Sequence, residues 1–260
     1  MSAGQGTREK PLLFNRSGRR SHRLGVRRRR ARVSCIQEAA HPLDCAPMFE
    51  MNGVRELFPT QVFVHQFEKE RYQPLNETIL AVLDKVARDA GAPAGAQLQT
   101  SSTFHRLPEA TALVEAIETA TRGVLEFLTV EHAGFEITGC WANLNPPGAS
   151  HPRHCHPNNF LSGVYYAAVA EDADTISFDD PRPHWTIIAP QLKEQRPELS
   201  NTVVMTVQAG TLILFPSWLV HFVEANTSAI TRVSIRFNVM FSSFAETISQ
   251  TRWSPTLPLP

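Results

Sequence analysis

Apolar residues recur at helical spacing in two segments near the start of the folded region. Over residues 74–90, an apolar stripe falls on one helical face and Gly91 ends the pattern. A second helix is predicted over residues 108–129, where Pro108 and Glu109 suit a first turn. The stripe residues are Leu75, Ile79, Leu83 and Val86 in the first helix, and Leu113, Ile117, Val124 and Leu128 in the second. Each helix is therefore expected to pack one face against a sheet.

The remaining pattern is typical of strands. Residues 57–64 alternate and are rich in aromatic and β-branched residues, which predicts a first strand ahead of the helices. The polar segment 184–202 is predicted to be a long loop. Many short strands without helices between them favour a sandwich or jelly roll, so the predicted fold class is mainly β with flanking helices, the two N-terminal helices packing on one sheet. The later strands are predicted over residues 135–143, 164–169, 175–178, 202–207, 211–215, 221–224 and 232–241.

The N-terminal segment differs from the rest in charge. Residues 1–36 hold ten Arg and one Lys against a single acid, whereas the remaining residues hold 14 basic and 24 acidic side chains. A segment of this composition buries too little apolar surface to fold. The predicted organisation is a disordered basic leader over residues 1–47, a folded domain over 48–246 and a tail over 247–260.

Three interpretations of the leader stay open. The first is an organellar transit peptide, and the second is a basic patch around Arg27–Arg30 for nucleic-acid binding or nuclear import. The third is that translation begins at Met48 or Met51, so that the leader is an over-extended start. The expected compartment is the cytoplasm, or a plastid or mitochondrion if the leader is a transit peptide. The four cysteines show no CxxC spacing, which favours a reducing compartment. No apolar run approaches the roughly 18 residues that would predict a membrane span.

The candidate chemistry is concentrated in a histidine-rich stretch. His154 and His156 are two residues apart, so on a strand their side chains would face one point, with Cys155 facing away. Such a pair can supply two imidazole ligands to a metal. His151 is a further candidate ligand, although its odd spacing predicts that it lies on the opposite face if the strand has already begun.

His221 is the candidate for the third metal ligand. It follows the predicted strand 211–215 and the turn at Pro216, a layout by which a jelly roll brings a distant residue onto an earlier strand. The spacing from Gly148 to Gly163, and from Gly210 to Pro216, is similar to that of the two cupin motifs. The glutamate usual in the first cupin motif is missing here.

A second family covers more of the chain. Residues 56–243 resemble the 2-oxoglutarate/Fe(II)-dependent oxygenases, and in particular a prolyl-hydroxylase-like group of 2OG-Fe(II) oxygenases. This resemblance implies a double-stranded β-helix, a jelly roll of cupin-like form. The motifs that carry it are His154-x-His156-Pro157, Leu161–Tyr166, Phe178-x-Asp180-Pro181-Arg182, Gly210–Trp218 and Arg232–Asn238.

The resemblance also implies the cofactors, Fe(II) and the co-substrate 2-oxoglutarate. Non-haem Fe(II) is held by three protein ligands that leave positions open, here His154, His156 and His221. Arg232 would bind the far carboxylate of 2-oxoglutarate through its planar fork, with Arg236, on the same face, as the reserve candidate. Tyr166 would share that carboxylate and Asn143 would line the pocket. No catalytic residue is expected beyond the metal centre.

One position departs from the usual pattern of this superfamily. An Asp or Glu normally follows the first histidine by two residues, and His156 stands there instead. Three neutral imidazoles still bind Fe(II), but they leave the site one negative charge short. Asp179 or Asp180 is a candidate to make up that charge.

The function predicted from the sequence is that of an Fe(II)- and 2-oxoglutarate-dependent dioxygenase, a hydroxylase acting on a small molecule or peptide. Two alternatives stay open: a cupin-type three-histidine metalloenzyme that does not use 2-oxoglutarate, and a metal-free β-sandwich binding module. Neither a membrane nor a nucleic acid is expected as a partner, and the sequence is compatible with a homodimer.

Overall fold

The computed structural model describes residues 57–93, 95–182, 191–194 and 196–242. By its contacts the chain divides into residues 1–57 and a compact unit of residues 58–260, and the fold given below is that of the second unit. The predicted leader, the tail and part of the predicted loop at 184–202 lie outside the described residues. The predicted domain bounds at 48 and 246 lie there too and stay predictions.

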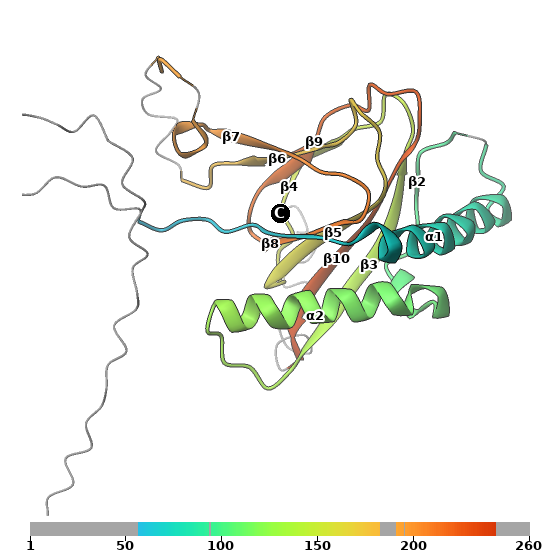
Figure 1. Ribbon diagram of the computed structural model, residues 1–260, viewed down its shortest axis with the longest axis horizontal. Helices are drawn as coiled ribbons and strands as arrows, with labels where there is room; N and C mark the ends of the chain where they lie inside the picture. The colour runs from blue at the N-terminus through green and yellow to red at the C-terminus, as the bar shows by residue number, and fades with distance from the viewer. Residues whose placement is uncertain (1–56, 94, 183–190, 195, 243–260) are drawn as a thin grey trace, which may run out of the picture. The chain divides into compact units, whose positions relative to one another are not determined.

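Within the described residues, ten strands form two antiparallel sheets, whose arrangement Figure 1 shows. The order is β1-β8-β5-β10-β3-β2 in the six-stranded sheet and β4-β9-β6-β7 in the four-stranded sheet. Two facing antiparallel sheets with strands exchanged between them confirm the predicted jelly roll. The strands are β1 (Phe63–Gln66), β2 (Leu98–Gln99), β3 (Phe135–Asn145), β4 (His151–His154), β5 (Leu161–Ala168), β6 (Thr175–Asp179), β7 (Thr202–Thr206), β8 (Thr211–Pro216), β9 (His221–Val223) and β10 (Arg232–Phe241).

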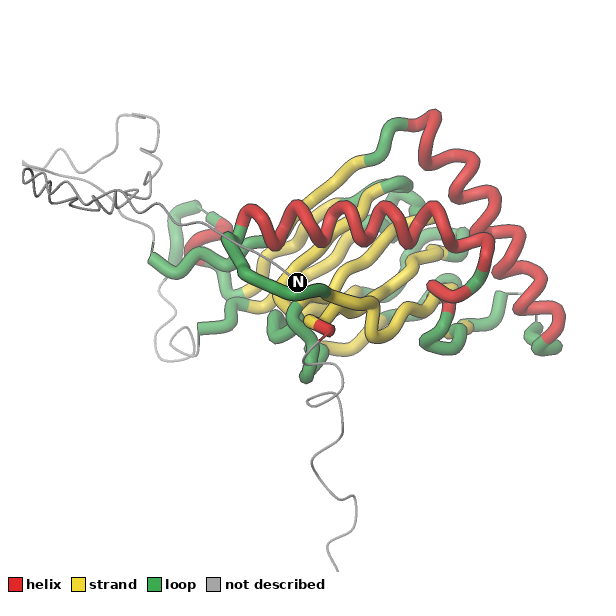
Figure 2. Tube along the Cα trace, turned by 90° about the horizontal axis from the view of Figure 1, so that it is seen from below, coloured by secondary structure: helices red, strands yellow, loops and turns green. Residues whose placement is uncertain are grey.

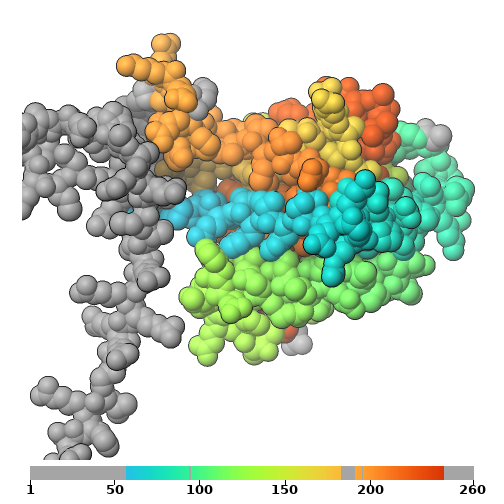
Figure 3. Space-filling model, viewed as in Figure 1, coloured from blue at the N-terminus to red at the C-terminus, as the bar shows by residue number. Residues whose placement is uncertain are grey.

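Helices α1 (Lys69–Asp89) and α2 (Thr111–Phe127) pack on the six-stranded sheet. Figure 2 shows both helices over the same face of the strands, and in Figure 3 they form adjoining parts of the surface. The predicted stripes point into this core, where Ile79, Leu83 and Ile117 are fully buried. The prediction of two helices on one sheet is therefore confirmed.

Strand β10 separates an apolar layer from a polar one. Its odd-numbered residues Val233, Ile235 and Phe237 join the core beneath the helices. Because side chains alternate along a strand, the even-numbered residues Arg232 and Arg236 face the space between the two sheets. Both arginines are buried there, so the inside of the jelly roll carries charge that the helix side lacks.

The N-terminal elements differ from the prediction. Residues 57–62 are not a strand, because β1 pairs only with β8, and that pairing stops at Phe63 opposite Leu214. Helix α1 begins at Lys69 rather than at the predicted Pro74, which lies inside the helix. Residues 108–110 form a separate 3-10 turn before α2. The two-residue strand β2, too short to show a pattern, was not predicted.

Candidate metal and co-substrate site

Three histidines converge where β4 meets β9. One nitrogen from each of His154, His156 and His221 lies within 4.8 Å of the others. The ring centroids are 4.3 Å apart for His154 and His221, 5.0 Å for His154 and His156, and 5.3 Å for His156 and His221. His154 is directly opposite His221 in the β4–β9 pairing. The cluster predicted from the sequence therefore forms, in a geometry that suits one metal ion.

Sheet pairing places His154 and His221, but His156 is held differently. Strand β4 ends at His154, so the predicted strand spacing of His154 and His156 does not apply. The backbone N–H of His156 instead donates to the Ser217 carbonyl at 2.9 Å, in the turn that joins β8 to β9. Cys155 is exposed and is not grouped with the three histidines.

Backbone carbonyls fix the tautomer of two histidines. The Nδ1 atom of His154 lies 2.7 Å from the Pro152 oxygen, and that of His221 lies 2.9 Å from the Leu219 oxygen. A carbonyl oxygen only accepts, so each Nδ1 carries the proton and each Nε2 presents a lone pair. This is the arrangement that metal-binding histidines commonly adopt.

The imidazoles are also held neutral. Burial, with a smaller contribution from neighbouring cationic groups, lowers the pKa of His156 to about 4 and that of His221 to about 3. The pKa of His154 is lowered as well, mainly by burial. Neutral imidazoles are the metal-binding form, so little proton competition is expected at neutral pH.

His151 lies beside the cluster rather than on the opposite face. The β4–β9 register shifts between His151 and His154, which marks a β-bulge. The extra residue breaks the alternation, so the His151 ring lies 5.3 Å from that of His154. The predicted opposite orientation is therefore wrong. Its buried Nδ1 has no hydrogen-bond partner among the described residues.

Two arginines on β10 face the same space. Arg232 donates from Nη1 to the Ala173 oxygen at 3.3 Å, while its Nη2 and the Nη1 of Arg236 are buried without a partner among the described residues. Burial is the main cause that lowers both pKa values, that of Arg236 to about 10. Burial is the largest cause of the lowered pKa of His154, His156 and His221, and the charge of Arg236 is a smaller one. Of these neighbouring histidines, His151 is the one whose pKa the charge of Arg232 also lowers. Arg236 is also the arginine nearer on β10 to Asn238, whose amide nitrogen lies 3.4 Å from His156 Nδ1.

Tyr166 and Asn143 complete this lining. Tyr166 lies opposite Ser234, between the two arginines, and burial raises its pKa to about 12 despite the opposing charge of Arg232. Its Oη and the Nδ2 of Asn143 are also buried without a partner in the described part of the chain. A buried polar group without a partner is costly. These unpartnered donors, with those of Arg232 and Arg236, are of the kind that a dianion such as 2-oxoglutarate would satisfy.

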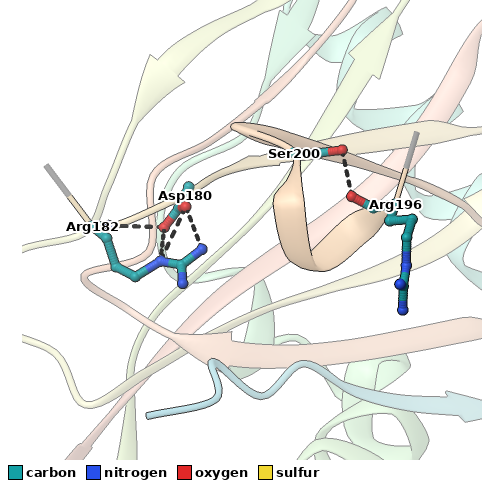
Figure 4. A network of polar contacts seen from close by, with 4 residues as sticks. All are labelled: Asp180, Arg182, Arg196 and Ser200. Atoms are coloured by element: carbon teal, nitrogen blue, oxygen red, sulfur yellow. Dashed lines mark hydrogen bonds and ion pairs between the residues drawn. The ribbon is translucent and has the colours of Figure 1, made fainter. Parts of the chain in front are cut away.

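The two acids proposed to supply the missing charge are held elsewhere. Asp179 pairs with Arg153 at 3.0 Å and accepts the Thr202 hydroxyl at 3.0 Å. Asp180 binds the Arg182 guanidinium with a shortest contact of 2.7 Å, as Figure 4 shows. Neither carboxylate is grouped with the three histidines. The described residues therefore give the triad an all-imidazole donor set.

Two residues near His156 were not singled out by the sequence. The Trp141 ring lies 5.9 Å from the His156 ring, and the Asn238 amide nitrogen lies 3.4 Å from His156 Nδ1. The alternation of side chains along each strand could have indicated both residues. Trp141 lies on the same face of β3 as Asn143, and Asn238 lies on the same face of β10 as Arg232 and Arg236.

Comparison with known proteins agrees with this site. Residues 139–238 match the family described as "Putative 2OG-Fe(II) oxygenase", and that stretch contains every site residue named above. No curated protein matches the chain. In the described residues, no helix combines the length and apolarity needed to cross a membrane.

Solved structures share the fold at low identity. AviO1 from Streptomyces viridochromogenes Tue57 is 12% identical with a TM-score of 0.51, covering 71% of this chain and 91% of its own. HygX from Streptomyces hygroscopicus, solved with nickel and 2-oxoglutarate bound, is 11% identical with a TM-score of 0.50, covering 70% and 83%. With the family match, these findings show that the chain carries, over residues 139–238, the domain of a 2-oxoglutarate- and Fe(II)-dependent oxygenase of the double-stranded β-helix fold.

Proposed function

We propose that His154, His156 and His221 bind Fe(II) through Nε2, and that the chain hydroxylates a small molecule or peptide. The observation that carries this proposal is the convergence of three neutral imidazoles beside buried, unpartnered cationic and hydroxyl donors. When bound, iron and 2-oxoglutarate together supply the oxidative chemistry, in which the co-substrate is converted to succinate and CO₂. The protein contributes binding, orientation and exclusion of water.

The co-substrate carboxylate far from the metal is assigned to Arg232 and Tyr166. Arg232 is the larger electrostatic influence on the Tyr166 hydroxyl, ahead of Arg236, and each group has a free buried donor. A guanidinium and a hydroxyl that meet on one carboxylate give charge-assisted bonds of defined direction. Asn143, on the neighbouring strand, offers its amide to the same ligand.

Arg236 is assigned to the part of the co-substrate nearest the metal. It lies four residues further along the same face of β10, nearer to Asn238, which contacts His156. Its charge would add to that of the metal beside the ligand portion next to the triad, whereas Arg232 would meet the far carboxylate. This arrangement favours 2-oxoglutarate over a monocarboxylate because each end of the ligand meets a buried cation.

Anaerobic titration of the full chain with Fe(II), followed by 2-oxoglutarate and oxygen, tests the proposal. We expect one equivalent of Fe(II) to bind and succinate to form, with both lost in His221→Ala. Screening metabolites and peptides for stimulated succinate release would then identify the substrate. Failure of the unmutated protein to bind Fe(II), or iron binding without any succinate, would contradict it.

A further inference from the structure

The three histidines differ in what holds the nitrogen turned away from the metal. For His154 and His221 this partner is the carbonyl two residues earlier, at 2.7 and 2.9 Å. His156 has no such carbonyl contact among the described hydrogen bonds. Its Nδ1 faces the side-chain amide of Asn238 at 3.4 Å. The ligand that stands in place of the usual acid is therefore the one whose ring is oriented by a side chain.

Asn238 is itself held in a buried network. The Ser162 hydroxyl lies 2.8 Å from Asn238 Oδ1 and 2.9 Å from the Ser217 hydroxyl. These three residues come from β5, the β8–β9 turn and β10, and all are buried. Ser217 also accepts the His156 backbone N–H through its carbonyl. One cluster thus fixes both the backbone and the ring of His156.

Hydrogen-bond chemistry determines how the network must be arranged when metal is bound. A histidine that binds through Nε2 carries its proton on Nδ1 and needs an acceptor there. The amide nitrogen cannot accept, whereas the amide oxygen can, and the two ends of an amide have nearly the same shape. With the amide turned over, Oδ1 accepts from His156 Nδ1 and Nδ2 donates to the Ser162 hydroxyl. Ser162 can then donate to Ser217, because a hydroxyl both donates and accepts.

We propose that Asn238 is the positioning residue of His156, accepting its Nδ1–H and so holding Nε2 toward the metal. The inference rests on the proposed function in that His156 is taken as a metal ligand. Outer-shell partners of this kind typically change metal affinity 10–100-fold when they are removed. The polar network on β5, the β8–β9 turn and β10 would then do for His156 what backbone carbonyls do for the other two ligands.

Co(II) alone is a suitable probe, with its affinity measured anaerobically by competition against a chromophoric chelator. We expect Asn238→Ala and Asn238→Leu, which remove the acceptor, to bind Co(II) about 10–100-fold more weakly. Asn238→Asp restores an acceptor and should keep affinity close to that of the unmutated protein. Ser234→Ala is the matched control, because Ser234 is buried on the same face of β10 without contacting His156. Its affinity should not change.

A second readout separates positioning from general structural damage. In proton NMR of the Co(II)-loaded protein, the metal shifts the Nδ1–H of each histidine ligand. We expect three exchangeable signals in the unmutated protein and in Asn238→Asp, and loss of one by fast exchange in any Asn238→Ala or Asn238→Leu protein that folds. If neither of these folds, loss of the His156 signal in Ser162→Ala tests the same network.

The possible outcomes are distinct. Unchanged Co(II) affinity with all three signals retained in Asn238→Ala or Asn238→Leu would overturn the role of Asn238 while leaving the metal site intact. Retention of the His156 signal in Ser162→Ala, where only that variant folds, would do the same. No Co(II) or Fe(II) binding by the unmutated chain would instead refute the proposed function, and the inference with it.

Discussion

Replacing Arg232 with methionine is the sharpest test of the co-substrate site. Methionine keeps much of the buried side-chain volume but removes the guanidinium, whose Nη2 has no partner among the described residues. Removing one partner of a buried, hydrogen-bonded charge pair costs about 2–5 kcal/mol. At about 1.4 kcal/mol per tenfold change, the Kd of 2-oxoglutarate should rise by about 30-fold to about 4,000-fold.

Calorimetric titration of 2-oxoglutarate into anaerobic, Fe(II)-loaded protein measures this Kd directly. Metal affinity should hold in Arg232→Met, because the hydrogen bond that Arg232 makes to a described residue goes to the Ala173 oxygen and not to any of the three proposed ligands. Arg122→Met is the matched control, since Arg122 is an exposed α2 residue whose partners among the described residues are Glu118 and Thr119. It should bind 2-oxoglutarate normally.

If Arg232→Met binds 2-oxoglutarate as the unmutated protein does, Arg232 is not the anchor. A large loss confined to Arg236→Met would then move that role to Arg236. Comparable losses in both variants fit the proposal that each end of the dianion meets one arginine.

Three further predictions concern stability. The metal-free protein should lose stability as the pH falls from about 6.5, the unfolded histidine value, toward 4. Burial holds the folded pKa of His156 near 4 and that of His221 near 3, so in this window the unfolded chain binds more protons and unfolding is favoured. Thermal melts across that range check this, and an identical slope in a His156→Gln/His221→Gln double variant would contradict it. Gly163→Ala should destabilise by about 1–3 kcal/mol through overpacking, because its Cβ would lie 2.2 Å from the Phe237 ring and 2.6 Å from the Ile213 carbonyl oxygen. Gly123→Ala in α2 meets nothing within 4 Å and should stabilise by about 0.5–1 kcal/mol. Urea unfolding measures both glycine variants, and equal effects would rule out the packing argument.

The sequence alone determined the layers and most of the candidate site. Period-3.6 and period-2 patterns are local properties, so the two helices and the principal strands could be read from them. The same alternation places Arg232 and Arg236 on one face of β10, as predicted. The chemistry was predicted from family motifs that contain three histidines and a distant arginine, because few functions need that combination.

Tertiary structure decided the features that depend on partners far apart in sequence. The first strand is short because its pairing with β8 stops at Phe63 opposite Leu214, although β8 itself continues to Pro216. A bulge opposite β9, invisible in the sequence, turns His151 toward the cluster. The position of His156 depends on Ser217 and Asn238, which are brought to it by the β8–β9 turn and β10. A local pattern can state which way a side chain leaves its own strand, but the atoms it meets are supplied by other strands, and only the folded chain brings them together.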